Sequence, residues 1–294
     1  ALVPLFAERP LIMHACSEDL EALAAFAGAY PRQVRDTQIA AALTGEDMQV
    51  GYQRLVESHM GVSLAKGATR TDWLKRPLSE EQLLYAEDDV KYLPALADQL
   101  ESQLLRLGRL EWWHEECARL RDDARRRAEP QAVWRQVKGA GNLQGRELAV
   151  LEALADWREA TARQRDLPKG FVLRDNTLLD LSRGGLRGRV DLQKLGVHPR
   201  AIRRDGDALL ALIEQAASAE PPAPLPGPLD PEQRGTVKAL RERVGRIAEE
   251  LSLKPDVLVR RRWLEALVRD PDTLPEPLTG WRQELVARPL REML

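Results

Sequence analysis

The chain has 294 residues, of which 44% are hydrophobic, and a formal net charge of −2. This length and apolar content can fill sizeable cores, which excludes disorder as the main state. Two cysteines without CxxC spacing exclude a disulfide scaffold and argue against a zinc site. No apolar run approaches the roughly 18 residues needed to cross a bilayer, and no secretory signal leads the chain. We therefore expect a soluble cytoplasmic protein without a membrane partner.

The charges are unevenly distributed. Residues 1–118 carry 11 Lys and Arg against 19 Asp and Glu, whereas residues 131–218 carry 15 against 11. Such an asymmetry suits a carboxylate-rich metal site beside a module that meets phosphates, although chance variation among solvated faces explains it equally well.

Two breaks divide the chain into three expected domains. The proline-rich stretch 221–230 predicts a semi-rigid spacer, and a strongly charged helix runs out at Pro130. The predicted domains are 1–128, 129–218 and 229–294.

The first domain alternates strands and helices. LIMH at 11–14 predicts a buried strand, the residues from 17 to 28 predict a helix, and VRDTQIAAALTG at 34–45 predicts a strand that passes into a second helix. Asp36 is expected to cap that second helix or to orient the sheet edge. This order predicts an α/β fold.

The stretch SEEQLLYAEDDVKYL carries the most informative residues. Ser79 and Gln82 form a capping-box pattern that starts a helix, which we expect to reach about Leu107 with a bend near Pro94. Tyr85 and Asp89 lie four residues apart, so the phenol and the carboxylate share one helix face.

Segments along most of the chain resemble ribonuclease D, a family of 3′-5′ exonucleases with four acidic residues and a tyrosine. The likeness lies in LIMHACSEDLEAL, DTQIAAAL, GYQRLVE, KGATRTDWLKRPLS and YAEDDVKYLPAL. It implies an α/β, ribonuclease H-like exonuclease domain. In that family Asp19 and Asp89 would be metal ligands, and Tyr85 would position the attacking water.

Phosphodiester hydrolysis of this kind uses two divalent cations, Mg²⁺ or Mn²⁺, which prefer carboxylate oxygens. On the resemblance, Asp89 belongs with the cation that activates water and Asp19 with the cation that faces the leaving oxygen. The catalytic residues would therefore be Tyr85, Asp19 and Asp89.

The family also uses an Asp-x-Glu pair on the first strand of its sheet. The only such patterns here are Asp19-Leu-Glu21, within an expected helix, and Asp230-Pro-Glu232, beside the spacer. The sequence thus resembles a ribonuclease D that lacks its first strands. We expect a chain of these 294 residues alone to be inactive or nearly so, because metal affinity follows the number and charge of the ligands.

The second domain has helical periodicity throughout. Its succession of Leu151, Leu154, Trp157 and Arg158, followed by RDLPKGFVLRDNTLLDL, resembles the all-α HRDC bundle, whose usual role is contact with nucleic acid. The third domain, which contains GWRQEL at 280–285, resembles a second and more divergent HRDC domain.

Basic and aromatic residues suggest where RNA would bind. The candidates are Lys66, Arg70, Trp73 and Arg76 in the loop before the Tyr85 helix, and Arg158, Lys169 and Arg174 in the second domain. A structural role, with Trp73 anchoring the loop and Arg76 paired with a carboxylate, is an equally good interpretation of the loop. His14 and Cys16 are expected to pack rather than to react.

The main hypothesis is a metal-dependent exoribonuclease that trims 3′ ends of structured RNA such as tRNA precursors, without an obligate protein partner. One alternative is a non-catalytic nucleic-acid-binding adaptor. Another is a 3′-5′ exonuclease that acts on DNA, since the same carboxylates serve either sugar.

Overall fold

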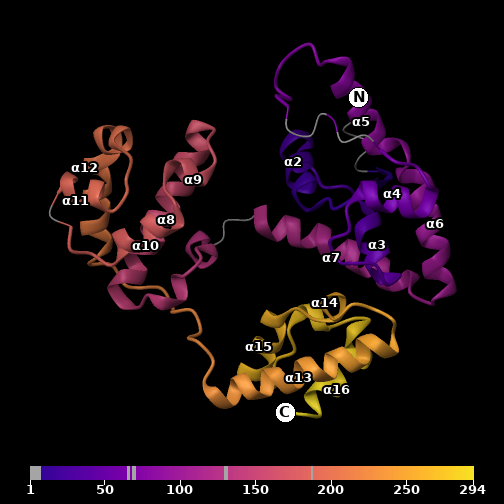
Figure 1. Cartoon of the computed structure of the whole chain (residues 1–294). Helices are drawn as coiled ribbons and strands as arrows, with labels where there is room; N and C mark the ends of the chain where they lie inside the picture. Colours follow the sequence, from indigo (N-terminus) through magenta and orange to yellow (C-terminus); the bar gives the residue numbers. More distant parts are fainter. Residues whose placement is uncertain (1–7, 65–66, 68–70, 129–131, 187) are drawn as a thin grey trace. The chain divides into compact units, whose positions relative to one another are not determined.

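A computed structural model of the chain describes residues 8–64, 67, 71–128, 132–186 and 188–294. The chain forms two compact units (Figure 1). One unit combines Ala1–Ala128 with Leu229–Leu294, and the other is Glu129–Pro228. In the described part of the chain, no helix is both long and apolar enough to cross a membrane.

A small parallel sheet organises the first unit. Strand β1 (Pro10–Met13) pairs with β2 (Gln33–Asp36), with Leu11 opposite Val34, and helix α2 (Ser17–Ala27) makes the crossover between them. The sequence predicted these three elements and the α/β class, and the structure confirms them.

Asp36 ends β2 and begins helix α3 (Thr37–Leu43). Its side chain is 1% exposed and accepts hydrogen bonds from the backbone N–H groups of Gln38 and Ile39, at 2.8 and 3.2 Å. The capping role predicted for Asp36 is therefore confirmed.

Further helices complete this part of the unit: α4 (Tyr52–Met60), α5 (Glu80–Lys91), α6 (Leu93–Arg106) and α7 (Leu110–Ala128). The capping box of Ser79 and Gln82 is present at the start of α5, as predicted. The expected bend is also present, because α5 ends at Lys91 and α6 begins at Leu93, one residue before the proline.

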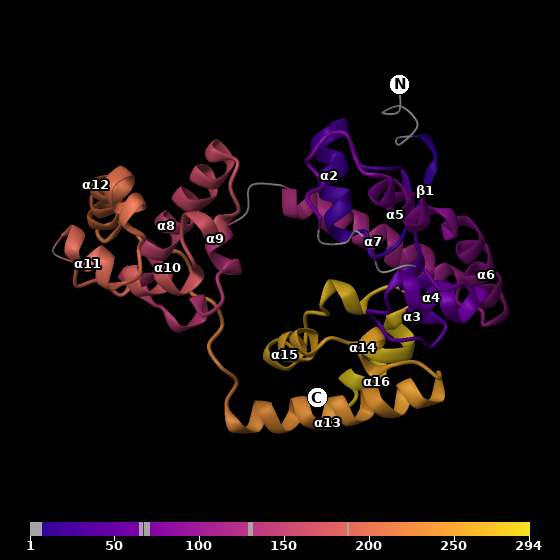
Figure 2. The same cartoon turned by 45° about the horizontal axis from the view of Figure 1, so that its top comes forward.

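The C-terminal segment packs against the same hydrophobic core as these helices. It contains α13 (Pro231–Glu250), α14 (Pro255–Leu258), α15 (Arg261–Arg269), the short 3₁₀-helix η3 (Glu276–Leu278), the π-helix η4 (Gln283–Ala287), and α16 (Arg288–Arg291). Figure 2 shows these orange and yellow elements gathered beside α13. The structure thus groups 229–294 with 1–128, and a separate second HRDC-like domain stays a prediction.

Polar and aromatic contacts join α7 to this segment. The indole rings of Trp112 and Trp281 stack with their centroids 4.3 Å apart. Arg282, which is 3% exposed, pairs with Glu116 of α7 and donates to the carbonyl oxygens of Val257 and Leu258, both at 2.8 Å. Because the Arg282 guanidinium is engaged by all these contacts, it has a structural role where α7 meets the C-terminal segment.

The secondary-structure elements in the described part of the second unit are all helices, as the sequence predicted. Its elements are η1 (Val133–Gln136), η2 (Ala140–Asn142), α8 (Gly145–Arg165), α9 (Lys169–Val172), α10 (Asp175–Ser182), α11 (Arg189–Lys194) and α12 (Pro199–Ala216). Its core surrounds Trp134 and the buried face of α8, including Leu148, Leu151 and Leu154. Asp205 on α12 accepts two hydrogen bonds from Arg165 on α8, at 2.7 and 2.9 Å.

Candidate active site

Asp19 lies in the first turn of α2, just beyond β1. The connection between these elements is tight: Ala15 has φ +55°, and Asp36 accepts hydrogen bonds from the backbone N–H groups of Ala15 and Cys16, at 3.3 and 2.9 Å. Cys16 is fully buried, which confirms its predicted packing role. The buried Asp36 carboxylate therefore holds the turn that presents Asp19.

Asp89 lies on the last turns of α5, and its carboxylate accepts a hydrogen bond from the phenol of Tyr85 one turn earlier. The spacing of these two residues predicted this shared face. Tyr85 is half-buried, and its ring lies 5.8 Å from that of Trp73. The phenol is thereby fixed between the loop and the carboxylate.

The two carboxylates line one cavity of about 430 Å³. Its other lining residues are Ile12, Met13, His14, Tyr52, Val90 and Leu93. Tyr85 is not in this lining and meets the cavity through Asp89. The structure thus brings together Asp19 and Asp89 from distant parts of the sequence.

The electrostatics of this cavity favour a bound cation. Asp19 and Asp89 are both exposed to solvent, but partial desolvation raises the pKa of Asp19, with the charges of Glu18 and Asp36 adding to the effect. Partial desolvation also raises the pKa of Asp89; the hydrogen bond from Tyr85 opposes this, and the charge of Asp88 adds to it. Among the described residues, neither carboxylate has an ion-pair partner. A bound cation would lower both pKa values again, because it stabilises the ionised carboxylates.

The donor set fits hard cations such as Mg²⁺ or Mn²⁺, because it consists of carboxylate oxygens. His14 is not available to a metal. Its Nδ1 lies 2.9 Å from the Thr37 hydroxyl, its Nε2 lies 3.1 Å from the Val50 carbonyl oxygen, and burial lowers its pKa. The described residues contain no group of three or more metal-ligating side chains. Two carboxylates are therefore what these residues offer.

Tyr52 is a residue of this cavity that the sequence analysis missed. Its hydroxyl donates to the carbonyl oxygen of Asp88 at 3.1 Å and accepts from the backbone N–H of Tyr92 at 3.2 Å. Those two backbone groups are four residues apart and would bond to each other in an unbroken helix. The phenol is inserted between them, at the junction of α5 and α6. Nothing in the local pattern of GYQRLVE indicates this contact.

Known proteins resemble this chain over most of its length. A 3′-5′ exonuclease family model matches residues 1–105, and an HRDC domain model matches residues 147–213. Ribonuclease D of Pseudomonas paraeruginosa is 40% identical over 292 residues, which cover 96% of this chain and 77% of the relative. Ribonuclease D of Escherichia coli is 36% identical, with 96% and 78% covered.

A solved structure also matches this chain. The crystal structure of Escherichia coli RNase D, described as an exoribonuclease involved in structured RNA processing, superimposes with a TM-score of 0.89 at 35% identity. The match covers 100% of this chain and 82% of the other. The chain belongs to the ribonuclease D family. It is accordingly a 3′-5′ exoribonuclease with an exonuclease domain and an HRDC domain.

The loop before α5 holds four of the residues predicted to bind RNA in this ribonuclease D chain. Lys66 and Arg70 lie outside the described residues. Trp73 is half-buried against Tyr85, and Arg76 donates from Nη1 to the carbonyl oxygens of Trp73 and Lys75, at 2.8 and 3.0 Å. Both described residues therefore shape the loop, and an RNA contact for them stays a prediction.

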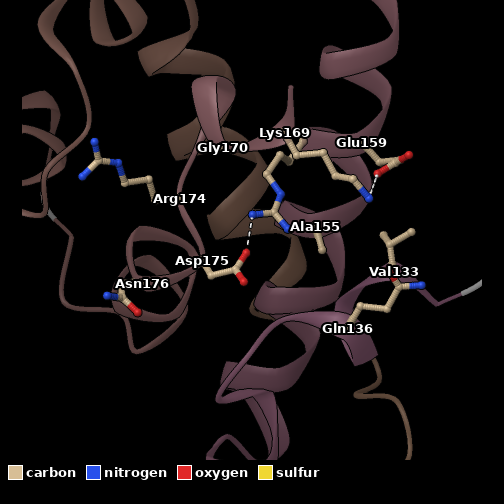
Figure 3. Close-up of a pocket in the computed structure, with 10 residues that line it drawn as sticks. Val133, Gln136, Ala155, Glu159, Lys169, Gly170, Arg174, Asp175 and Asn176 are labelled. Carbon is tan, nitrogen blue, oxygen red and sulfur yellow. Dashed lines mark hydrogen bonds and ion pairs between the residues drawn. The ribbon is translucent and has the colours of Figure 1, made fainter. Parts of the chain in front are cut away.

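The HRDC-containing unit brings Arg158, Lys169 and Arg174 to one pocket of about 500 Å³ (Figure 3). Arg158 is buried and bonds to Asp175 at 2.7 Å, and the ammonium of Lys169 lies 3.0 Å from a carboxylate oxygen of Glu159. Arg174 is exposed and has no side-chain partner among the described residues; Figure 3 shows it directed away from Lys169. Arg174 is thus the one of these three whose charge is not already neutralised.

Proposed function

We propose that this chain removes nucleotides from the 3′ ends of structured RNAs, such as tRNA precursors, with Asp19 and Asp89 as ligands of Mg²⁺ or Mn²⁺. The observation that carries the proposal is the single cavity lined by both carboxylates. Their raised pKa values and their lack of a cationic partner among the described residues support it.

In this proposal each side chain has a defined part. The carboxylate of Asp89 orients the water that attacks the terminal phosphodiester, and Tyr85, already bonded to Asp89, is placed to hydrogen-bond that water. Asp19 lies on the side of the leaving oxygen. The divalent cations, when bound, supply the positive charge that stabilises the phosphoryl transition state.

The substrate, the nucleic-acid partner and the cellular location are part of the same proposal. Family membership favours RNA as the substrate, and the HRDC domain favours a nucleic-acid partner. We place the protein in the cytoplasm, because both cysteines are buried and unpaired, as expected in a reducing compartment.

Metal binding by the 294-residue chain tests the ligand assignment directly. We expect Asp19→Asn and Asp89→Asn each to weaken binding of Mn²⁺, measured by titration, by roughly tenfold or more, because a ligand charge is lost. Asp88→Asn is the matched control: it removes an equal charge from the same helix but leaves the cavity lining intact. Equal affinities for all four proteins would reject Asp19 and Asp89 as ligands.

Cleavage of 5′-labelled RNA tests the reaction. With Mg²⁺ or Mn²⁺ present, we expect stepwise shortening from the 3′ end. Loss of Asp89 should reduce the rate by roughly 100-fold or more, since several kcal/mol of charge stabilisation disappear. A matched DNA oligonucleotide separates the DNA alternative, and tight RNA binding without shortening would support the adaptor.

A further inference from the structure

A second cavity lies within the first unit, between the exonuclease helices and the C-terminal segment. It has a volume of about 510 Å³, within the range of roughly 300–1,000 Å³ typical of ligand sites. One part of its wall is formed by Ser17 and Glu18, which directly precede Asp19 on α2. Another part is formed by Arg260, Arg262 and Trp263 around the start of α15. The cavity therefore connects the turn that presents Asp19 with the C-terminal segment.

Three arginines in this wall already have carboxylate partners. Arg282 pairs with Glu116, Arg119 pairs with Glu115 and Glu276, and Arg127 pairs with Glu21. Because these ion pairs neutralise the three charges, we assign the three arginines a structural role.

Arg260 and Arg262 are different. Both are exposed, and neither side chain has a hydrogen bond or ion pair with a described residue. Although Arg260 is exposed, partial desolvation beside the cavity wall lowers its pKa, and the positive charges of Arg262 and Arg282 lower it further, against smaller opposing effects of Glu116 and Asp123. Two adjacent guanidinium groups thus create a positive potential that the described protein does not neutralise.

The aromatic wall adds a second recognition element. Trp263 is half-buried, and the guanidinium carbons of Arg260 and Arg282 lie 5.7 and 5.5 Å from its ring centroid. Arginine groups held over an aromatic ring, beside an open cavity, suit a nucleic-acid strand, since guanidinium groups bind phosphate oxygens in pairs and bases stack on indole rings.

The carboxylates in the same wall do not remove this potential. Asp36 is engaged with four backbone N–H groups, and Glu116 with Arg282. Asp123 is bonded to Arg126. Glu18 lies at the α2 end and is not among the charges that act on Arg260. The region around Arg260 and Arg262 remains positive.

We propose that Arg260 and Arg262, beside Trp263, bind a backbone phosphate of the RNA substrate while its 3′ end occupies the Asp19 and Asp89 cavity. This rests on the proposed function and adds to it a binding site in the C-terminal segment, outside both the exonuclease and the HRDC family matches. The site would hold the strand upstream of the nucleotide that is cut.

The tripeptide 260–262 contains its own control. Arg261 has the same charge and neighbours in sequence, but it pairs with Glu265 at 2.7 Å and does not line the cavity. Arg260→Ala, Arg262→Ala and Arg261→Ala each remove one positive charge from the same place in the chain. Arg260→Lys keeps the charge but not the planar fork.

The measurement is the binding of fluorescently labelled single-stranded RNA to the full 294-residue chain in EDTA, by anisotropy, at several salt concentrations. We expect Arg260→Ala and Arg262→Ala to weaken binding by about fivefold or more, and to reduce the slope of log Kd against log salt by about 0.7 for each lost phosphate contact. Arg261→Ala should change Kd by less than about twofold, and Arg260→Lys should lie between. Thermal unfolding of each variant should match that of the parent.

The outcomes separate this site from the exonuclease proposal, because no cleavage is needed for the binding measurement. Weaker binding in the two cavity variants supports the site even if the chain cuts no RNA. Equal Kd values and salt slopes for Arg260→Ala, Arg261→Ala and Arg262→Ala would overturn it even if cleavage proceeds. A parent chain that binds no RNA would overturn it as well.

Discussion

The carboxylates of the exonuclease cavity and two paired carboxylates of the helical second unit, Asp205 and Glu159, have opposite surroundings. Asp19 and Asp89 have raised pKa values and no cationic partner among the described residues. In the second unit, the hydrogen bonds from Arg165 lower the pKa of Asp205, and the bond from Lys169 opposes the burial of Glu159 and lowers its pKa. Ion pairs give Asp205 and Glu159 a structural role, whereas Asp19 and Asp89 lack a countercharge.

This contrast distinguishes carboxylates that an ion pair holds in the fold from carboxylates that lack a countercharge. A buried ion pair is complete in the folded protein, so its loss is felt as instability. Carboxylates that repel each other or are desolvated without a partner reduce stability until a cation binds, which is a common feature of active sites. The same criterion distinguishes Arg282, which is fully engaged, from Arg260 and Arg262.

The largest expected effect concerns the number of carboxylates in the cavity. We expect the double variant Asp19→Asn with Asp89→Asn to shorten RNA at least about 100-fold more slowly than the parent, because metal affinity follows the count and charge of ligands. The comparison uses one labelled RNA and saturating Mg²⁺ or Mn²⁺. Asp88→Asn, which leaves the cavity lining intact, is the control. Equal rates for the three proteins would show that the two cavity carboxylates are not needed.

A large effect on stability is expected from the paired carboxylate Asp205. Asp205→Asn should destabilise the second unit by about 2–3 kcal/mol, since a nearly buried, bidentate hydrogen-bonded pair with Arg165 is lost. Asp207→Asn, on the same helix but with an exposed pair to Arg189, should change little. Denaturant unfolding followed by circular dichroism measures both.

The pH dependence of that difference has a definite sign. Because the folded-state pKa of Asp205 is lowered, its stabilising effect is present above the ordinary carboxyl pKa of about 4 and is lost as the pH falls through the lowered value. The gap between the parent and Asp205→Asn should therefore close in acid. A gap that widened toward low pH would contradict the ion-pair interpretation.

A smaller effect on activity is expected from Tyr52, a positioning residue. In Tyr52→Phe the carbonyl of Asp88 and the N–H of Tyr92 lose the inserted hydroxyl and can bond directly, which would move the end of α5 that carries Asp89. We expect kcat to fall by roughly 3- to 10-fold with little change in KM, because a small displacement of a ligand affects the reacting geometry more than substrate binding. Tyr30→Phe, which loses a hydroxyl bond to Ala124 away from the cavity, is the control. A change in KM alone would point to substrate contact instead.

The sequence predicted the local structure well, because the signals there are local. The capping box at Ser79, the proline beside the α5–α6 junction and the cap at Asp36 each follow from residues within a few positions. The spacing of Tyr85 and Asp89 likewise fixed their common face. Family resemblance was needed to connect Asp19 to them, since no periodicity relates residues so far apart.

The contacts that the sequence analysis did not find are long-range. The bonds of Tyr52 to the α5–α6 junction, of Arg282 to Glu116, and of Arg109 to Leu43 and Leu251 join separate segments. They depend on how the C-terminal segment and α4 pack, which charge counts and helix periods do not encode. Arg158 shows the same limit: its spacing on α8 suits an RNA-binding residue, yet its side chain is buried against Asp175.

The smallest expected effect is on the unfolding temperature, and it tests the charge of Asp89 in the cavity. Without divalent metal at neutral pH, Asp89→Asn should unfold at a slightly higher temperature than the parent, because ionised Asp89 has a raised folded-state pKa and so disfavours folding. This advantage should disappear as the pH falls and Asp89 becomes protonated. Adding Mg²⁺ or Mn²⁺ should raise the unfolding temperature of the parent more than that of the variant, since ligand binding stabilises the folded state by mass action. If metal raised both temperatures equally, the cation would lie elsewhere, and the contrast between unpaired and paired carboxylates would no longer identify the site.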